Sequence, residues 1–273
     1  MNPRLQKRVQ RYGWDRAVGD YEAGWRCQLE PAQARMLELA RLRSGEQVLD
    51  VACGTGLVSF RALEAVGEAG AVLGTDISGE MVAAARAQAQ VDGRHNVRFE
   101  RADAECQDIE SDGFDAALCA LGLMYVPDPD RAMGEMYRAL KPGGRAAAAV
   151  WGARANCGWA DIFPITDARV ESDVCPMFFA LGTGDTLANC FEAAGFADVQ
   201  SERISVALSY SSEDEALGAA FRGGPVALAY SRFDTPTRAA VHRDYLDSIA
   251  PFRHGEGYRI PGEFVVARGD KRH

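Results

Sequence analysis

The sequence predicts an α/β fold built on a mostly parallel sheet. Between residues 46 and 151, short apolar segments rich in β-branched residues alternate with segments of helical periodicity. Such alternation predicts parallel strands joined by right-handed crossover helices. The 273 residues contain no repeat and no low-complexity linker. We therefore expect one domain over residues 1–273, with a helical N-terminal cap at 1–45, a ligand-binding core at 46–151, and further strands with cap insertions at 152–273.

Seven segments are predicted to form strands. Each is a short apolar or alternating run bounded by glycine, proline or polar residues. In chain order they are residues 46–52, 70–78, 96–103, 114–123, 145–151, 197–210 and 258–269.

The helices predicted in the core carry end signals. Ser78 is suited to cap the helix that follows it. Gly67 closes the helix before it, and Pro142 with two following glycines closes the last core helix. The predicted core helices span residues 56–67, 79–91 and 129–144.

Helices are also predicted on both sides of the core. Pro31 suits the first turn of a helix that ends at Ser44 and Gly45, and Pro236 is expected to open the last helix. The flanking helical segments are residues 31–43, 158–172 (interrupted near Pro164), 184–196 (closed by Gly195) and 212–250.

Composition restricts the class of protein. No apolar run approaches the roughly 18 residues that cross a bilayer, and the N-terminus lacks the apolar core of a secretory signal. The net charge of −9 argues against a broad nucleic-acid surface. The local exception, interpreted as a solvated helix face, consists of Arg4, Lys7, Arg8 and Arg11.

The cysteines indicate a reducing compartment. There are seven, an odd number, and no pair has CxxC spacing. This pattern predicts neither a disulfide framework nor a metal site. We therefore expect a cytoplasmic protein with mostly buried thiols.

The segment EQVLDVACGTGLVSF, residues 46–60, carries the main ligand signal. Its strand ends near Ala52, and open parallel sheets bind ligands beyond the carboxyl ends of their strands. Gly54 and Gly56 permit a tight turn and close approach of the backbone to a ligand. The loop also opens a helix, whose free N–H groups point toward whatever binds.

Two ligand classes remain open at this loop. The Gly-Lys-Ser/Thr of a P-loop is absent, and Ser59 stands where a dinucleotide site has its third glycine. Asp76 ends the second strand about 20 residues further on, where an acid can accept hydrogen bonds from ribose hydroxyls. Both dinucleotides and S-adenosylmethionine contain such a ribose.

Two further acids favour a cationic ligand. Asp103 ends the third strand, where a carboxylate can reach an exocyclic amine and the Ala104 amide can reach a ring nitrogen. Asp50 precedes the loop, and an acid there suits an ammonium or sulfonium group better than a pyrophosphate. Together with Asp76 these residues indicate S-adenosylmethionine.

Four motifs, VLDVACGTG, GTDIS, RADAE and ALKPGGR, resemble the successive motifs of class I S-adenosylmethionine-dependent methyltransferases. Residues 120–145 are similar to the ubiquinone/menaquinone-biosynthesis methyltransferase group. The resemblance covers residues 44–151 and, more loosely, 191–199. It implies a Rossmann-like, doubly wound sheet of seven strands, mostly parallel, with the last strand (258–269) antiparallel. It also implies S-adenosylmethionine as cofactor and S-adenosylhomocysteine as product.

The resemblance implies cofactor roles by position. Gly54, Thr55 and Gly56 would hold the methionyl part beside Asp50. Asp76 would bind the ribose, Ile77 would pack on adenine, and Asp103 with Ala104 would bind the adenine edge. The expected cofactor residues are Asp50, Ala52, Cys53, Gly54, Thr55, Gly56, Asp76, Ile77, Met81, Asp103, Ala104, Glu105 and Leu121. We expect Cys53 to be a small packing residue.

The chain departs from the quinone enzymes in its substrate segments. Met124 and Tyr125 stand where those enzymes have an arginine-asparagine pair, and residues 152–185 and 211–250 have no counterpart. The cofactor is therefore carried over, but the quinone is not. We expect in-line methyl transfer to a small or medium organic acceptor, without a catalytic dyad. The alternatives are an RNA or protein methyltransferase, an NAD-dependent oxidoreductase, and a cofactor-binding protein without catalysis.

The acceptor is expected in a fairly apolar pocket. Its walls would come from segments that cap the crevice, since aromatic side chains suit both a sulfonium methyl and an apolar acceptor. The candidate residues are Tyr12, Trp14, Tyr21, Trp25, Met124, Tyr125, Trp151, Phe178, Phe179 and Tyr230.

Overall fold

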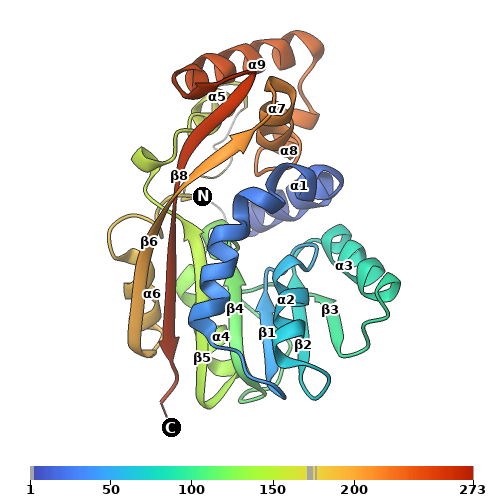
Figure 1. The fold of residues 1–273 in the computed structure, drawn as a ribbon, viewed down its shortest axis with the longest axis vertical. Coiled ribbons are helices and arrows are strands. Elements are labelled where there is room, and N and C mark those ends of the chain that lie inside the picture. The colour runs from blue at the N-terminus through green and yellow to red at the C-terminus, as the bar shows by residue number, and fades with distance from the viewer. Residues whose placement is uncertain (1–2, 171–174, 176, 273) are drawn as a thin grey trace.

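The computed structural model describes residues 3–170, 175 and 177–272, and its centre is one mixed sheet with strands in the order β3-β2-β1-β4-β5-β8-β6 (Figure 1). The first five strands are parallel, whereas β8 runs antiparallel between β5 and β6. This confirms the predicted Rossmann-like sheet, to which β7 adds a two-residue strand beside β8. The strands are β1 (Gln47–Val51), β2 (Ala71–Asp76), β3 (Val97–Arg101), β4 (Phe114–Ala120), β5 (Leu140–Trp151), β6 (Ala197–Tyr210), β7 (Arg253–His254) and β8 (Gly257–Asp270).

Helices cover both faces of the sheet. α2 and α3 pack on β1 to β3, α4 packs on β4 and β5, and α6 packs on β6 and β8. Central strands are therefore apolar on both faces, and residues 146–149 of β5 are fully buried alanines. The core helices are α2 (Leu57–Val66), α3 (Gly79–Val91), α4 (Pro129–Ala139) and α6 (Thr186–Ala193).

The first helix, α1 (Pro3–Ala40), differs from the prediction. Pro31 does not begin a new helix but lies inside one continuous helix, which ends at Ala40 rather than at Ser44. Leu29 and Met36, on either side of the proline, are both buried. Tertiary packing on both sides of Pro31 therefore stabilises the helix despite the missing backbone donor.

Two further boundaries differ from the prediction. β4 ends at Ala120 rather than at residue 123, because Leu121 has a φ of 61° and a 3-10 turn, η1 (Leu123–Tyr125), follows. α4 ends at Ala139 rather than at residue 144. Residues 141–144 instead form an irregularity inside β5, where the register with β4 shifts.

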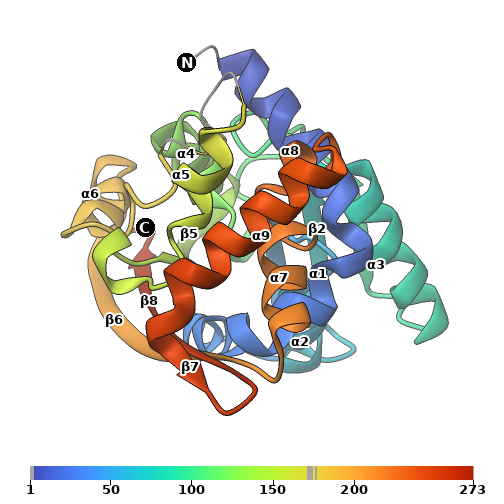
Figure 2. The same ribbon diagram turned by 90° about the horizontal axis from the view of Figure 1, so that it is seen from above.

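The remaining helices gather beyond the end of β5, in the upper part of Figure 1. Pro236 opens α9 as predicted, with Asp234 as its N-cap. Figure 2 shows α9 crossing this end of the molecule above α7. Residues 171 and 172 of the predicted helical segment lie outside the described residues. These elements are η2 (Arg154–Asn156), α5 (Ile162–Asp167), α7 (Glu213–Phe221), α8 (Ala227–Ser231), α9 (Thr235–Ile249) and η3 (Ala250–Phe252).

The paired strands β6 and β8 connect the sheet to this helical end. β5 pairs with β8 only from Phe264 to Asp270, whereas β6 stays paired with β8 as far as Tyr258. About half of the β6–β8 ladder therefore projects beyond the rest of the sheet. None of the helices described is long and apolar enough to cross a membrane.

Candidate active site

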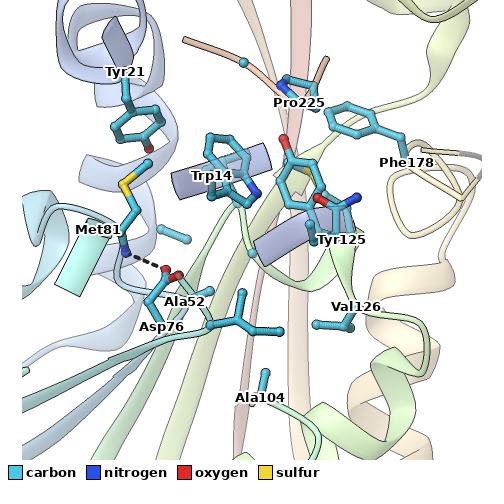
Figure 3. Close-up of a pocket in the computed structure, with 18 of the residues that line it drawn as sticks. Trp14, Tyr21, Ala52, Asp76, Met81, Ala104, Tyr125, Val126, Phe178 and Pro225 are labelled. Carbon is cyan, nitrogen blue, oxygen red and sulfur yellow. Dashed lines mark hydrogen bonds between the residues drawn. The ribbon is translucent and has the colours of Figure 1, made fainter. Parts of the chain in front are cut away.

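A pocket lies at the carboxyl ends of β1 to β4, with about 1020 Å³ of empty volume including its open mouth (Figure 3). Each of these strands contributes a lining residue at or just after its last position. α1 contributes residues between Lys7 and Leu29. The strand-end residues are Ala52, Asp76, Ala102, Asp103, Ala120 and Leu121, and those from α1 include Lys7, Gln10, Trp14, Tyr21 and Trp25.

The glycine loop after β1 turns as its residue types predict. Gly54 and Gly56 have φ values of 55° and 89°, in the left-handed region that favours glycine. A Cβ at Gly56 would lie 2.8 Å from the Phe60 ring and 3.1 Å from the Phe99 ring. Gly54 faces the pocket, so its backbone lies where a ligand can contact it directly.

Asp76 holds the glycine loop against the end of β2. Its Oδ2 accepts a hydrogen bond from the Gly54 N–H at 2.9 Å, and its Oδ1 accepts one from the Ser78 N–H at 2.8 Å. Burial raises the pKa of Asp76, and these two N–H groups oppose that rise. The carboxylate still lines the pocket and retains free lone pairs, so it can accept hydrogen bonds from a diol.

Asp50 lies buried beside the loop and does not line the pocket. The Ser59 hydroxyl donates to its Oδ2 at 2.5 Å, while its Oδ1 has no hydrogen-bond partner among the described residues. Burial, together with the charge of Asp76, raises the pKa of Asp50 to about 7. Ser59 stands where a dinucleotide site has its third glycine, and here its hydroxyl orients the Asp50 carboxylate.

Lys7 binds the acids that follow β3, a contact the sequence analysis does not predict. Its Nζ lies 2.7 Å from Asp103 Oδ2 and 2.6 Å from Glu105 Oε2. The buried Glu105 also accepts a hydrogen bond from the Asp128 N–H at 3.0 Å. In the sequence, the basic character of the first helix was the only feature that pointed to this contact. Arg11 of the same helix also forms an ion pair, 3.9 Å from Asp15. Part of the predicted solvated face therefore points inward.

The structure brings most of the predicted cofactor residues to one pocket. Those that line it are Ala52, Gly54, Asp76, Ile77, Met81, Asp103, Ala104 and Leu121. Those that do not line it, all buried next to the lining, are Asp50, Cys53, Thr55, Gly56 and Glu105. Cys53 Sγ lies 3.0 Å from where a Cβ at Gly74 would be, which fits a packing role. The individual ligand contacts stay predictions.

Aromatic rings form the other side of the pocket. Trp14 contacts Tyr21 and Tyr125 edge to face, with centroids 5.7 and 5.2 Å apart. Tyr125 contacts Phe178 at 5.3 Å, and Phe178 contacts Trp159 at 5.6 Å. We call the continuous set Trp14, Tyr21, Trp25, Tyr125, Trp151, Trp159 and Phe178 the aromatic wall. Trp159 is not among the predicted acceptor residues, because nothing in its local sequence separates it from a core residue.

Three predicted acceptor residues do not line this pocket. Tyr12 is 47% exposed on the outer side of α1. Phe179 packs against Trp159 and Phe163, outside the lining. Tyr230 forms a hydrogen bond of 2.9 Å with His242 Nε2. The predicted residues that do line the pocket are Trp14, Tyr21, Trp25, Met124, Tyr125, Trp151 and Phe178.

Comparisons with known proteins agree with this geometry. Residues 48–144 match the family model of a methyltransferase domain. Over 110 residues, 40% of this chain, the sequence is 42% identical to the ubiquinone/menaquinone biosynthesis C-methyltransferase UbiE of Methylococcus capsulatus. The chain spans only 44% of that relative's length.

Two other proteins match over most of the chain. The nocamycin O-methyltransferase of Saccharothrix syringae is 26% identical over 268 residues, covering 93% of this chain and 95% of its own. The solved structure of the YcgJ protein from Bacillus subtilis has the same fold, with a TM-score of 0.62 at 19% identity, covering 89% of this chain and 99% of that one. Residues 48–144 are therefore similar to a methyltransferase domain, a stretch of 110 residues is also similar to UbiE, and the chain has a fold found in other solved structures.

Proposed function

We propose that this protein transfers a methyl group from S-adenosylmethionine to a small or medium organic acceptor by in-line displacement. The observation that carries the proposal is one pocket with Asp76 and Asp103 on one side and the aromatic wall on the other. The relative that matches over nearly the whole chain is named nocamycin O-methyltransferase, which supports a small-molecule acceptor.

The residues present fit the cofactor. Asp76 is placed to accept hydrogen bonds from ribose hydroxyls, and Met81 and Ile77 offer apolar surface beside it. Two buried oxygens near the glycine loop, Asp50 Oδ1 and Thr55 Oγ1, have no partner among the described residues. Neither residue lines the pocket, so an ammonium group on a ligand would satisfy these oxygens only after a shift of the glycine loop. When bound, S-adenosylmethionine supplies an electrophilic methyl group on a sulfonium sulfur.

The chain's own contribution is to position the reactants and exclude water. α1 covers the pocket from above, and Lys7 fixes its N-terminal end to the turn after β3. The aromatic wall surrounds the remaining space with rigid, water-excluding surfaces. Positioning of this kind accounts for catalysis without a dedicated base when the acceptor is already nucleophilic.

Lys7 and Arg11 are engaged in ion pairs, so the first helix offers less free basic surface for RNA than its sequence suggests. The seven cysteines are all free thiols, which supports a cytoplasmic location. We also propose that residues 152–273 complete the sheet and supply the acceptor side of a single domain.

Isothermal titration calorimetry with S-adenosylhomocysteine and with NAD tests the proposal. We expect micromolar binding of S-adenosylhomocysteine and none of NAD. NAD binding, or no binding of either compound by the folded protein, would overturn the proposal.

A further inference from the structure

One buried donor in the aromatic wall lacks a partner. Trp159 is 3% exposed, and within the described part of the chain its indole N–H donates to nothing. Trp25, its neighbour at 5.9 Å, donates its indole N–H to the Ala219 carbonyl at 3.1 Å. Buried donors in proteins are nearly always satisfied. Because Trp159 lines the pocket, we take this N–H as a candidate donor to a bound molecule.

A second donor lies on the same side of the pocket. Figure 3 shows the Tyr125 hydroxyl directed toward the space beside Phe178 and Pro225. Burial raises the pKa of Tyr125 well above 10, so this hydroxyl keeps its proton at neutral pH. Tyr125 and Trp159 both contact the Phe178 ring, at 5.3 and 5.6 Å. Two proton donors therefore flank one apolar ring.

The charged groups of the pocket lie elsewhere. Among the described lining residues the charged ones are Lys7, Asp76 and Asp103, all at the strand ends or the start of α1. Near Tyr125 the titratable groups are Tyr21 and the buried thiol of Cys175, and the charge of Asp167 acts on that thiol. Burial raises the pKa of both Tyr21 and Cys175, so neither serves as a base at neutral pH.

This distribution discriminates between classes of acceptor. A protonated amine bound beside Tyr125 would have to lose its proton where neither Tyr21 nor Cys175 serves as a base, and an alcohol has the same difficulty. An oxygen acid with a low pKa is already ionised in water and needs no base. Its anionic oxygen can accept from N–H and O–H donors, which bind an anion more strongly than a neutral group.

We propose that the acceptor is a planar, largely apolar molecule with an oxygen acid that is ionised at neutral pH, such as a carboxylic acid or an acidic enol. Trp159 Nε1–H and Tyr125 Oη–H bind its anionic oxygen. This inference rests on the proposed methyl-transfer function. The acceptor loses its proton to water before binding. Its oxygen then forms a bond to the methyl carbon, and the carbon–sulfur bond breaks with its electron pair moving to sulfur.

Calorimetry with three matched probes tests this inference. Naphthoic acid, naphthalenemethanol and naphthylmethylamine share one ring system and differ in the charge of the polar group. Each is titrated into protein loaded with sinefungin, a cofactor analogue with a cationic amine at the methyl position. We expect naphthoate to bind at least tenfold more tightly than the other two. Equal or weaker binding of naphthoate, or no naphthoate binding, overturns the inference.

Two substitutions test the assigned donors. Trp159→Phe and Tyr125→Phe each keep a ring and remove one donor, and each should reduce the preference for naphthoate over the alcohol about tenfold. Tyr137→Phe removes a hydroxyl outside the pocket, where the ring packs on Phe196, and should leave the preference unchanged. A purely structural role would weaken all three probes together. An unchanged preference in both pocket variants overturns the assignment.

Sinefungin binding separates the two proposals. If the wild-type protein binds sinefungin but shows no preference for the acid, only the inference about the acceptor fails. If the folded protein does not bind sinefungin, the cofactor assignment fails, and the inference that depends on it fails as well.

Discussion

The ammonium group of Lys7 lies 2.7 Å from the carboxylate of Asp103, which joins the first turns of α1 to the loop after β3 across 96 positions of sequence. The same ammonium pairs with the buried Glu105 at 2.6 Å. These contacts hold α1 over the side of the pocket where we expect the adenosine group. We expect release of a ligand from that side to involve movement of α1 or breakage of this contact.

Replacing Lys7 should speed release of the ligand. In Lys7→Met the N-terminal turns of α1 lose their ion pairs, and we expect S-adenosylhomocysteine to dissociate several times faster in stopped-flow displacement. The variant also leaves the buried Glu105 carboxylate without its cation, so the melting temperature should fall as well. Arg26→Met is the matched control, since Arg26 pairs with Glu22 on the same helix. Equal dissociation rates in wild type and Lys7→Met would show that α1 does not gate the pocket.

Removing the Asp76 carboxylate should weaken cofactor binding. Asp76→Ala deprives ribose hydroxyls of a charged acceptor and frees the Gly54 N–H from its partner. We expect the Kd for S-adenosylhomocysteine in calorimetry to rise at least tenfold, equivalent to about 1.5–3 kcal/mol. Glu100→Ala removes an exposed acid from neighbouring β3 and should bind as wild type. Wild-type affinity in a folded Asp76→Ala protein would place the ribose elsewhere.

The buried acid Asp50 should make stability depend on pH. Its pKa of about 7 in the folded protein lies above the ordinary value near 4 of an unfolded aspartate. Between these values the folded state binds more protons, so the free energy of unfolding falls as pH rises. Asp50→Asn keeps an acceptor for the Ser59 hydroxyl but has no charge to bury, so its unfolding free energy should not fall in this way. We expect the variant to be more stable than wild type by a few kcal/mol at pH 8.

Urea unfolding at several pH values measures the Asp50 effect. The difference between Asp50→Asn and wild type should shrink as pH falls from about 7 and vanish near pH 4. Because the charges of Asp50 and Asp76 interact, the difference includes the change in Asp76 titration that follows from removing the Asp50 charge. A stability difference that is constant over this range would mean that Asp50 keeps an ordinary pKa.

The loop after β1 and the loop after β4 approach each other closely beside the pocket. A Cβ at Gly122 would lie 2.3 Å from the Cβ of Ala52, which itself has a φ of 56°. Gly122→Ala should therefore cost about 2 kcal/mol of unfolding free energy. The double variant Ala52→Gly with Gly122→Ala removes that clash, although Cys119 Sγ at 3.0 Å still limits the fit. We expect urea unfolding to show recovery of at least about 1 kcal/mol. If the changes in unfolding free energy of the two single variants simply add in the double variant, the clash between Ala52 and the new Cβ does not cause the loss.

The sequence predicts the parts of the molecule that local patterns determine. Apolar runs predict the sheet, and the separation of Gly56 from Asp76 predicts that both reach one edge of it. Pro31 could not be placed, because the burial that stabilises α1 on either side of it comes from distant strands. Boundaries at Ala120 and Ala139 depend on backbone turns that the residue types alone do not determine.

The pocket was harder to predict on its acceptor side. Cofactor residues follow strands in a fixed order, so their positions can be read from the chain. Trp159 and Lys7 reach the pocket from irregular or helical segments, where a tryptophan in a core and a lysine on a surface would have the same local pattern. Tyr230 was predicted to line the pocket but does not, since its side chain is hydrogen-bonded to His242 instead.

The projecting half of the β6–β8 ladder determines how the two ends of the molecule can move. Residues 258–263 stay paired with β6 without support from β5, so we expect them to act as a stiff arm that carries α7 to α9. A pair of hydrogen-bonded strands bends far less easily than a single linking peptide. We therefore expect α7 to α9 to keep a fixed position relative to the sheet. The acceptor side would then be preformed, and the entry of ligands into the pocket would depend on α1, whose covalent link to the sheet lies at its C-terminal end.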